Sequence, residues 1–241
     1  YHIEPTFRFW VGGPEKMPDE DTALLRTVRA LGYRKYLLEP FPFQFDTTAP
    51  VLGGAPVDEG ALTSSTQLTF AWVAATDAGV GVVTYEYQLA ADPSFATVVT
   101  SGTLPATQEM TTLTGADGLT WYLRIRATDA LGNTSGFSDA SDGIRVDTTA
   151  PTVVAILPST LGPTTATAVD FGVFFSEPVF GFGDAGDLTV NVTGSVTYTT
   201  VSVTQVSTTS YTATVAGIAG EGSLTIQAVA GAGVDLAGNA S

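Results

Sequence analysis

Two stretches of the chain carry a pattern of oxygen-bearing side chains that suits a hard cation. They are Asp129-x-x-Gly132-Asn133 and Asp235-x-x-Gly238-Asn239. Carboxylate, amide and backbone oxygens are the ligands that Ca²⁺ prefers, although the spacing here matches no EF-hand loop. The same residue types also form tight turns, in which an Asp or Asn side chain caps nearby backbone groups. The pattern therefore predicts either a turn or a calcium site.

The sequence contains few of the residues that catalytic sites need. The single histidine is His2 and cysteine is absent, which excludes histidine-based triads, zinc sites and cysteine nucleophiles. No glycine-rich phosphate loop follows a predicted strand and opens a helix. Glu177 precedes Pro178 at the end of a predicted strand, and the sequence assigns it no acidic partner for glycoside hydrolysis. We therefore predict that the protein is not an enzyme.

A five-residue repeat divides the part of the chain that would position these residues. Asp-Thr-Thr-Ala-Pro occurs at residues 46–50 and again at residues 147–151. Threonine favours extended backbone, and proline fixes its own φ and keeps the preceding alanine out of the helical region. The repeat predicts short, stiff joints and three parts: residues 1–45, 46–146 and 147–241.

Apolar residues alternate with polar or small ones through both larger parts. Residues 46–146 contain seven predicted strands and residues 147–241 contain at least five. The first set is Val51–Leu52, Gln67–Val73, Val83–Leu89, Ala96–Ser101, Gln108–Leu113, Trp121–Arg126 and Gly143–Val146; the second is Thr167–Phe175, Leu188–Val192, Val196–Val203, Tyr211–Val215 and Leu224–Ala228. The predicted fold class is all-β, with two tandem antiparallel β-sandwiches.

Two individual features follow from this alternation. Trp72 falls on an inward-facing position and is predicted to be a core residue. Tyr122, Arg124 and Arg126 form an outward stripe, which predicts a solvated sheet face or, because basic residues are scarce here, a salt bridge or partner contact. The glycine- and aspartate-rich residues 181–187 predict a plain connecting loop.

Residues 46–146 resemble a bacterial fibronectin type III module. The resemblance rests on the run from Tyr85 to Phe95, on Asp117–Ala127 and on Asp129–Ser138. In that family a tyrosine usually stands where this chain has Trp121, four residues before Ile125. Residues 147–241 are similar to bacterial immunoglobulin-like repeats, on Phe175–Val179, Asp187–Val190, Tyr211–Val215, Gly220–Leu224 and Val234–Asn239.

These resemblances imply a role and a place for the candidate metal site. Such modules serve as spacers, adhesin stalks and accessory domains of secreted and surface proteins. Related repeats often stiffen their joints with calcium. The resemblance thus makes Asp129, Asn133, Asp139 and Asp147 the candidate ligands, at the junction between the two sandwiches.

Residues 1–45 differ from the rest in composition. They are rich in aromatic side chains, their acidic and basic residues balance, and they contain a predicted amphipathic helix at about residues 19–31. This segment either caps a β domain or acts as a docking arm, since aromatic residues and arginine anchor interfaces. The candidate partner-binding residues are Phe7, Phe9, Trp10, Arg26, Arg29, Tyr33, Tyr36, Phe41, Phe43 and Phe45.

The net charge of −15 at pH 7 lies entirely in residues 46–241 and argues against nucleic acid as a partner. No apolar run is long enough to span a bilayer. We expect an extracytoplasmic bacterial protein, periplasmic or at the cell surface, that docks through its arm to other protein subunits, for instance at the outer face of a membrane complex. The alternatives are a carbohydrate-binding or adhesin stalk fragment and an accessory part of a secreted hydrolase.

Overall fold

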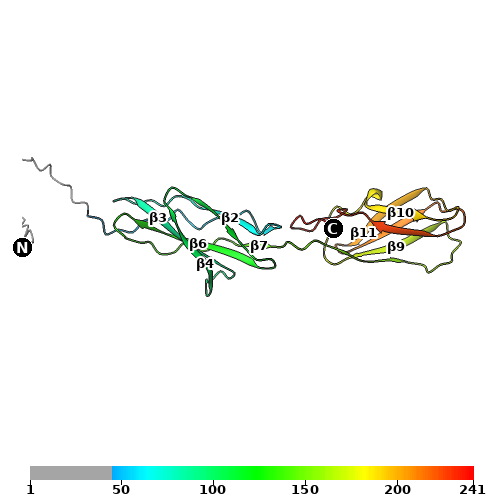
Figure 1. The fold of residues 1–241 in the computed structure, drawn as a ribbon, viewed down its shortest axis with the longest axis horizontal. Helices are drawn as coiled ribbons and strands as arrows, with labels where there is room; N and C mark the ends of the chain where they lie inside the picture. Colours follow the sequence, from blue (N-terminus) through cyan, green and yellow to red (C-terminus); the bar gives the residue numbers. More distant parts are fainter. Residues whose placement is uncertain (1–44) are drawn as a thin grey trace, which may run out of the picture. The chain divides into compact units, whose positions relative to one another are not determined.

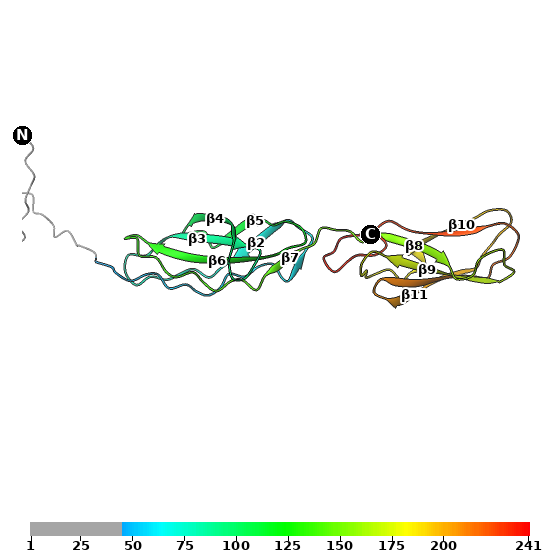
Figure 2. The ribbon, with the colours of Figure 1, turned by 90° about the horizontal axis from the view of Figure 1, so that it is seen from below.

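The computed structural model describes residues 45–241. The predicted helix at about residues 19–31 and all the candidate arm residues except Phe45 lie outside this range. The described part consists of strands and loops with one short 3₁₀ helix, η1 (Ala185–Asp187) (Figures 1 and 2). The predicted all-β class is confirmed.

Residues 45–146 form a sandwich of two sheets. One sheet has the strand order β1-β7-β6-β3-β4 and the other pairs β2 with β5. All pairs are antiparallel except β1 with β7. The strands are β1 (Leu62–Thr63), β2 (Gln67–Ala71), β3 (Val82–Ala90), β4 (Val98–Pro105), β5 (Met110–Thr114), β6 (Thr120–Asp129) and β7 (Ile144–Val146).

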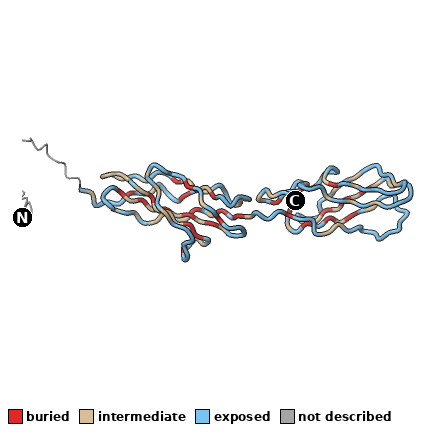
Figure 3. Tube along the Cα trace, in the orientation of Figure 1, coloured by how far each residue is buried: buried red, intermediate tan, exposed pale blue. Residues whose placement is uncertain are grey.

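The first core follows from the period of two in these strands. Along β6, buried residues alternate with half-buried ones over the whole strand, so that every second side chain enters the core. Trp72 is buried there, as predicted, and packs edge-on against Tyr85 with ring centroids 5.5 Å apart. Figure 3 marks the buried residues along the trace of the chain.

The Trp121 side chain bonds to the backbone just before β6. Its indole Nε1 donates to the carbonyl oxygen of Ala116 at 3.1 Å, while the ring is buried in the core. The backbone corner before β6 is therefore held by a tryptophan side chain. Gly115 is required beside it, because a Cβ at this position would lie 2.7 Å from the same Nε1.

Residues 147–241 form a second sandwich. One sheet has the order β11-β12-β9-β8 and the other pairs β10 with β13, all antiparallel. The strands are β8 (Val153–Pro158), β9 (Ala168–Phe175), β10 (Leu188–Val192), β11 (Thr200–Ser207), β12 (Ser210–Ala216) and β13 (Leu224–Ala228). Figure 2 shows β10 in a layer apart from β8, β9 and β11.

An aromatic cluster lies at one end of the second core. Phe175, Phe182 and Tyr211 contact one another edge to face, with centroids 5.1 to 5.9 Å apart. The Tyr211 hydroxyl donates to the carbonyl oxygen of Val179 at 2.8 Å. The loop at residues 181–187, predicted to be a plain connection, therefore also places Phe182 in the core, where its ring is 3% exposed.

Candidate functional site

The two repeated motifs of the sequence meet each other in the first sandwich. The Asn133 side-chain amide donates to the carbonyl oxygen of Asp46 at 3.0 Å and to Asp129 Oδ2 at 2.7 Å. Asp129 Oδ1 accepts the backbone N–H groups of Leu131 and Asn133. Asn133 thus ties the start of the first Asp-Thr-Thr-Ala-Pro segment to the turn that follows β6.

The second sandwich repeats this contact. The Asn239 amide donates to the carbonyl oxygen of Asp147 at 2.7 Å and to Asp235 Oδ2 at 2.8 Å, and Asp235 Oδ1 accepts the Asn239 N–H. Pro50 and Pro151, which end the two repeated segments, are both buried. We call the Asn133 and Asn239 contacts the asparagine latches. Each latch fixes the entry of the chain into its own sandwich.

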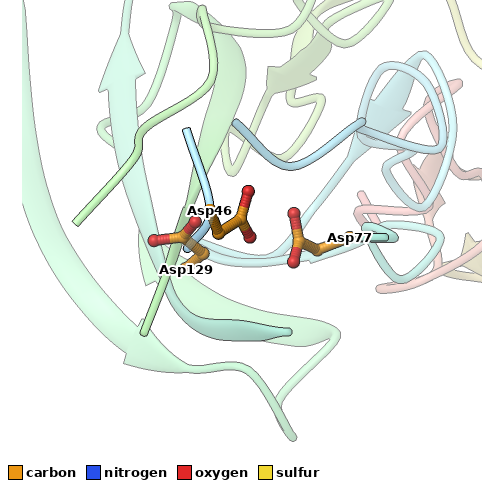
Figure 4. Close-up of side chains that lie close together, drawn as sticks. All are labelled: Asp46, Asp77 and Asp129. Atoms are coloured by element: carbon orange, nitrogen blue, oxygen red, sulfur yellow. The ribbon is translucent and has the colours of Figure 1, made fainter. Parts of the chain in front are cut away.

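Each latch lies beside a cluster of three carboxylates. Asp46, Asp77 and Asp129 form the first cluster, and one oxygen of each lies within 4.8 Å of the others (Figure 4). Asp46 accepts the N–H of Thr48 and of Val80, and Asp77 Oδ2 accepts the N–H of Gly79 and of Gly81. Asp77 Oδ1 is buried and has no hydrogen-bond partner among the described residues.

Hydrogen bonds favour the ionised forms of Asp46 and Asp129. The hydrogen bonds from Thr48 lower the pKa of Asp46 below its ordinary value. Burial acts to raise the pKa of Asp129, but the bonds from Asn133 and Leu131 outweigh it, so that this pKa is lowered as well. Asp46 and Asp129 therefore present negative charge at neutral pH.

The second cluster consists of Asp147, Glu177 and Asp235, again within 4.8 Å of one another. Burial and the charges of Asp147 and Asp235 raise the pKa of Glu177. The pKa of Asp235 is lowered, because bonds from Asn239 and the following turn outweigh its burial. Glu177 is thus the member of the cluster whose ionisation is disfavoured.

The four predicted calcium ligands do not form a single site in the structure. Asp129 and Asn133 lie together, as expected, but with Asp46 and Asp77 at the entry to the first sandwich. Asp147 lies with Glu177 and Asp235, and exposed Asp139 belongs to neither cluster. The regrouping arises because a sandwich brings its entry segment and the turn after its sixth strand to the same end.

Asp77 and Glu177 were not candidates in the sequence. A signal for them exists in the equivalent local sequences Thr76-Asp77 and Ser176-Glu177, which follow the second strand of each sandwich. Just after the buried prolines, Thr76 and Val51 exchange two backbone hydrogen bonds. Ser176 donates its N–H to the carbonyl of Thr152 and accepts the Thr152 N–H at its side-chain Oγ. This pairing places the next residue, Asp77 or Glu177, close to the latch of its own sandwich.

The second Asp-Thr-Thr-Ala-Pro segment is also bonded on its other side. Asp117, in the turn before β6, accepts the N–H of Thr148 at 2.7 Å and the hydroxyl of Thr149 at 3.4 Å. The bond from the Thr148 N–H is the largest of several that lower the pKa of Asp117. Residues 147–149 therefore have hydrogen-bonding partners in both sandwiches: Thr63 and Asp117 in the first, and Asn239 in the second.

The outward stripe on β6 makes internal contacts. Arg126 forms an ion pair with Glu86 at 2.6 Å, and Arg124 donates to Gln88. The Arg124 guanidinium lies 4.3 Å from the Phe95 ring centroid and 4.4 Å from that of Phe137. Of the alternatives for this stripe, the salt bridge is present.

A cavity of about 360 Å³ lies in the second sandwich. Its lining comes from loop residues 158–166 and from core residues such as Val169, Phe171 and Ile218, and it contains no acidic or basic side chain. The carboxylate clusters therefore do not line it. A cavity without a titratable group offers no acid–base chemistry.

Comparisons with known proteins add little about function. No family profile matches the sequence, and no curated protein matches it. Among solved structures, a crystal structure of the FN1–FN3 domains of chicken CNTN1 is similar at 14% identity and a TM-score of 0.33, over 75% of this chain and 56% of that one. Over residues 45–241, we find no helix with the length and apolar character of a membrane span.

Proposed function

We propose that the chain is a non-catalytic structural or accessory segment that docks through residues 1–45 to a larger extracytoplasmic assembly. The observation that carries this proposal is the repeated latch, which orders the entry to each sandwich; at the second entry Asn239 bonds the carbonyl of Asp147 while Asp117 bonds Thr148 and Thr149. An ordered joint suits a protein that must hold attached parts at a set distance. The chemistry of the described residues favours this over catalysis, since the acidic clusters and the cavity are separate.

Deletion of residues 1–45 tests the docking role. We expect the deletion to abolish co-purification with partner subunits while both sandwiches keep their melting transitions, because each has its own core. Retained co-purification would contradict docking through these residues. A deletion that also removed the melting transitions would instead show that the segment belongs to the fold.

The alternative of glycan binding receives less support. Sugars stack on exposed aromatic rings, and the exposed aromatic residues of the described part come from four separate segments: Phe45, Phe174, Phe180 and Tyr198. Binding of residues 46–241 to a glycan array would nevertheless decide for that alternative.

Calcium binding at the two clusters remains part of the proposal. Its support is the recurrence of three carboxylates at equivalent positions and the lack, among the described residues, of a recorded ion pair between either cluster and Lys or Arg. Three carboxylates supply only part of the about six to eight oxygens that Ca²⁺ takes, so backbone oxygens or water would complete the shell.

The substitution Glu177→Gln should change the melting temperature of the second sandwich in opposite directions with and without calcium. Because the folded state raises the pKa of Glu177, it holds that proton more tightly than the unfolded chain. The stability of the second sandwich should therefore fall as pH rises from the ordinary glutamate pKa through the raised one. In chelator at pH 7 we expect Glu177→Gln to raise the melting temperature, whereas with calcium it should lower it by removing a ligand.

The control for this measurement is Glu221→Gln, at an exposed glutamate of the same sandwich. It should leave both melting temperatures unchanged. If calcium and chelator give the same melting curve for the wild-type protein, the clusters do not bind calcium.

The bond between Asp117 and Thr148 predicts an acid-sensitive joint. Because the folded pKa of Asp117 is lowered, its contribution is complete above the pKa of an unfolded aspartate and is lost as pH falls through the folded value. Asp117→Ala should produce the same loosening at neutral pH. We expect faster amide exchange at Thr148 and Thr149 in this variant, with the exchange of β6 unchanged.

A further inference from the structure

The three basic side chains of the described residues all lie on the outer face of one sheet in the first sandwich. Arg124 and Arg126 occupy half-buried positions of β6 that alternate with buried core positions, so both point away from the core. Arg145 of β7 is the cross-strand partner of Thr120 and therefore points to the same face. We call Arg124, Arg126 and Arg145 the arginine face. Because residues 46–241 contain eighteen acidic side chains, positive charge gathers on the described residues only here.

Aromatic rings hold two of these arginines in place. The guanidinium carbon of Arg124 lies 4.3 Å from the centroid of the Phe95 ring and 4.4 Å from that of Phe137. The guanidinium carbon of Arg126 lies 4.7 Å from the same Phe137 centroid. A cation is attracted to the face of an aromatic ring. Both guanidinium groups are therefore ordered in the free protein, which lowers the entropy cost of binding a ligand.

The loop between β3 and β4 presents Phe95 to Arg124 in an unusual backbone conformation. The φ of Phe95 is 54°, and no other non-glycine residue among those described has a positive φ. The Asp92 carboxylate accepts the N–H groups of Ser94 and Ala96, and the Asp92 carbonyl accepts that of Phe95. A left-handed conformation is costly for a bulky residue, and such strain is concentrated at binding and catalytic sites. The strained conformation of Phe95 therefore points to a function for the arginine that its ring contacts.

Each arginine of this face keeps hydrogen-bond donors free. Arg124 donates from Nε and Nη2 to Gln88 Oε1 at 2.9 and 2.6 Å. Arg126 donates from the same two nitrogens to Glu86 Oε2 at 2.9 and 2.6 Å. Neither Nη1 has a partner among the described residues, and the Arg145 side chain forms no hydrogen bond or ion pair with them. Free guanidinium N–H groups bind carboxylates with matching planar geometry.

The spacing of the arginine face matches that of an extended peptide. Strand residues rise about 3.4 Å each, so Arg124 and Arg126 project about 7 Å apart. Arg145, opposite Thr120, lies about 14 Å from Arg124 along the strand. Between them lies Tyr122, whose hydroxyl has no partner among the described residues. An extended peptide with an acidic residue at every second position would therefore place one carboxylate at each of these side chains.

We propose that the arginine face binds an extended acidic segment of a partner protein, with aspartate or glutamate at every second position. The free donors define the carboxylate chemistry, and the strand spacing defines the alternation. Nucleic acids and sulfated polysaccharides carry their charge more densely, so a protein with a net charge of −15 repels them more strongly. The arginine face is distinct from residues 1–45 and would add a second attachment point to the chain.

The test titrates the full chain into two fluorescently labelled peptides at low salt and follows fluorescence anisotropy. One peptide repeats the pair glutamate-threonine four times, and the matched control arranges the same residues as glutamate-glutamate-threonine-threonine. We expect the alternating peptide to bind about fivefold more tightly than the control, because its carboxylates match the arginine spacing. Salt at about 0.5 M should weaken its binding by screening the charges. Equal affinities for the two peptides, or binding of neither, would overturn the proposal.

Two substitutions locate the binding site. Arg124→Gln should weaken binding of the alternating peptide about tenfold, because it removes an ordered, charge-assisted donor. Arg145→Gln should weaken it about fivefold, and because Arg145 makes no internal side-chain contact, this variant keeps the test valid even if Arg124→Gln destabilises the sandwich. The control Asn191→Asp makes the same change in net charge at an exposed position of β10, and it should change the affinity by less than about twofold.

The same variants identify any other class of ligand. Unchanged peptide affinity in both Arg124→Gln and Arg145→Gln would show that the peptide binds elsewhere, and the proposal would be wrong. Heparin serves as the sulfated competitor. If it binds more tightly than the alternating peptide and loses affinity in both arginine variants, the arginine face is a sulfate site and the assignment to an acidic peptide is overturned.

Discussion

Tyr211→Ala is expected to lower the free energy of unfolding of the second sandwich by about 4 kcal/mol, the range measured for removal of large aromatic core residues. The ring is 3% exposed, and it contacts both Phe175 and Phe182. The cavity left by alanine would also deprive these two rings of their edge-to-face partner. Urea unfolding followed by near-ultraviolet circular dichroism would measure the loss.

Tyr211→Phe is the matched variant. It keeps the ring and removes only the hydroxyl that donates to Val179, so a loss of about 1 kcal/mol is expected. The chain's three tryptophans are Trp10, Trp72 and Trp121, and none lies in the second sandwich. The fluorescence transition should therefore be unchanged in both variants, and a shift in it would contradict independent cores.

Asn133→Ala is expected to destabilise the first sandwich by about 2 kcal/mol, because hydrogen bonds to charged groups contribute about 1.5 to 3 kcal/mol. The Asn133 amide bonds both a carboxylate oxygen of buried Asp129 and the carbonyl of Asp46. Without this amide, the carbonyl of Asp46 and Asp129 Oδ2 each lose one hydrogen-bond donor. The fluorescence of Trp72 and Trp121 would report the transition.

Two variants serve as controls for this measurement. Asn239→Ala should affect the second sandwich in the same way and leave the fluorescence transition in place. Asn191→Ala, at an exposed position of β10, should change stability by less than about 0.5 kcal/mol. Equal effects of Asn133→Ala and Asn191→Ala would show that the latch does not stabilise the fold.

The sequence predicted the strands well where alternation was long. β9, β10, β12 and β13 were predicted to within about a residue at each end, because inward and outward positions differ clearly in polarity. β1 is too short to show a period, and β8 is a continuous apolar run. β11 begins at Thr200 rather than Val196, because Thr197 pairs with Ala219 before the strand begins.

The candidate site was predicted only in part. Asp129 and Asn133 do lie together, since their spacing alone brings them together in a turn, while their role as calcium ligands stays a prediction. Asp129 and Asn133 lie beside Asp46, and Asp147 lies beside Asp235, because each sandwich places its entry segment and the turn after its sixth strand at the same end. Such contacts join residues more than eighty positions apart, and neither composition nor local spacing encodes them.

The Asn239 latch and Asp117 together order the joint at residues 147–149. Backbone ¹⁵N relaxation at Thr148 and Thr149 tests this most directly. We predict order parameters of about 0.85, equal to those of the strands. Order parameters below about 0.6 at these two residues, with rigid strands on both sides, would show a flexible linker and contradict an ordered joint.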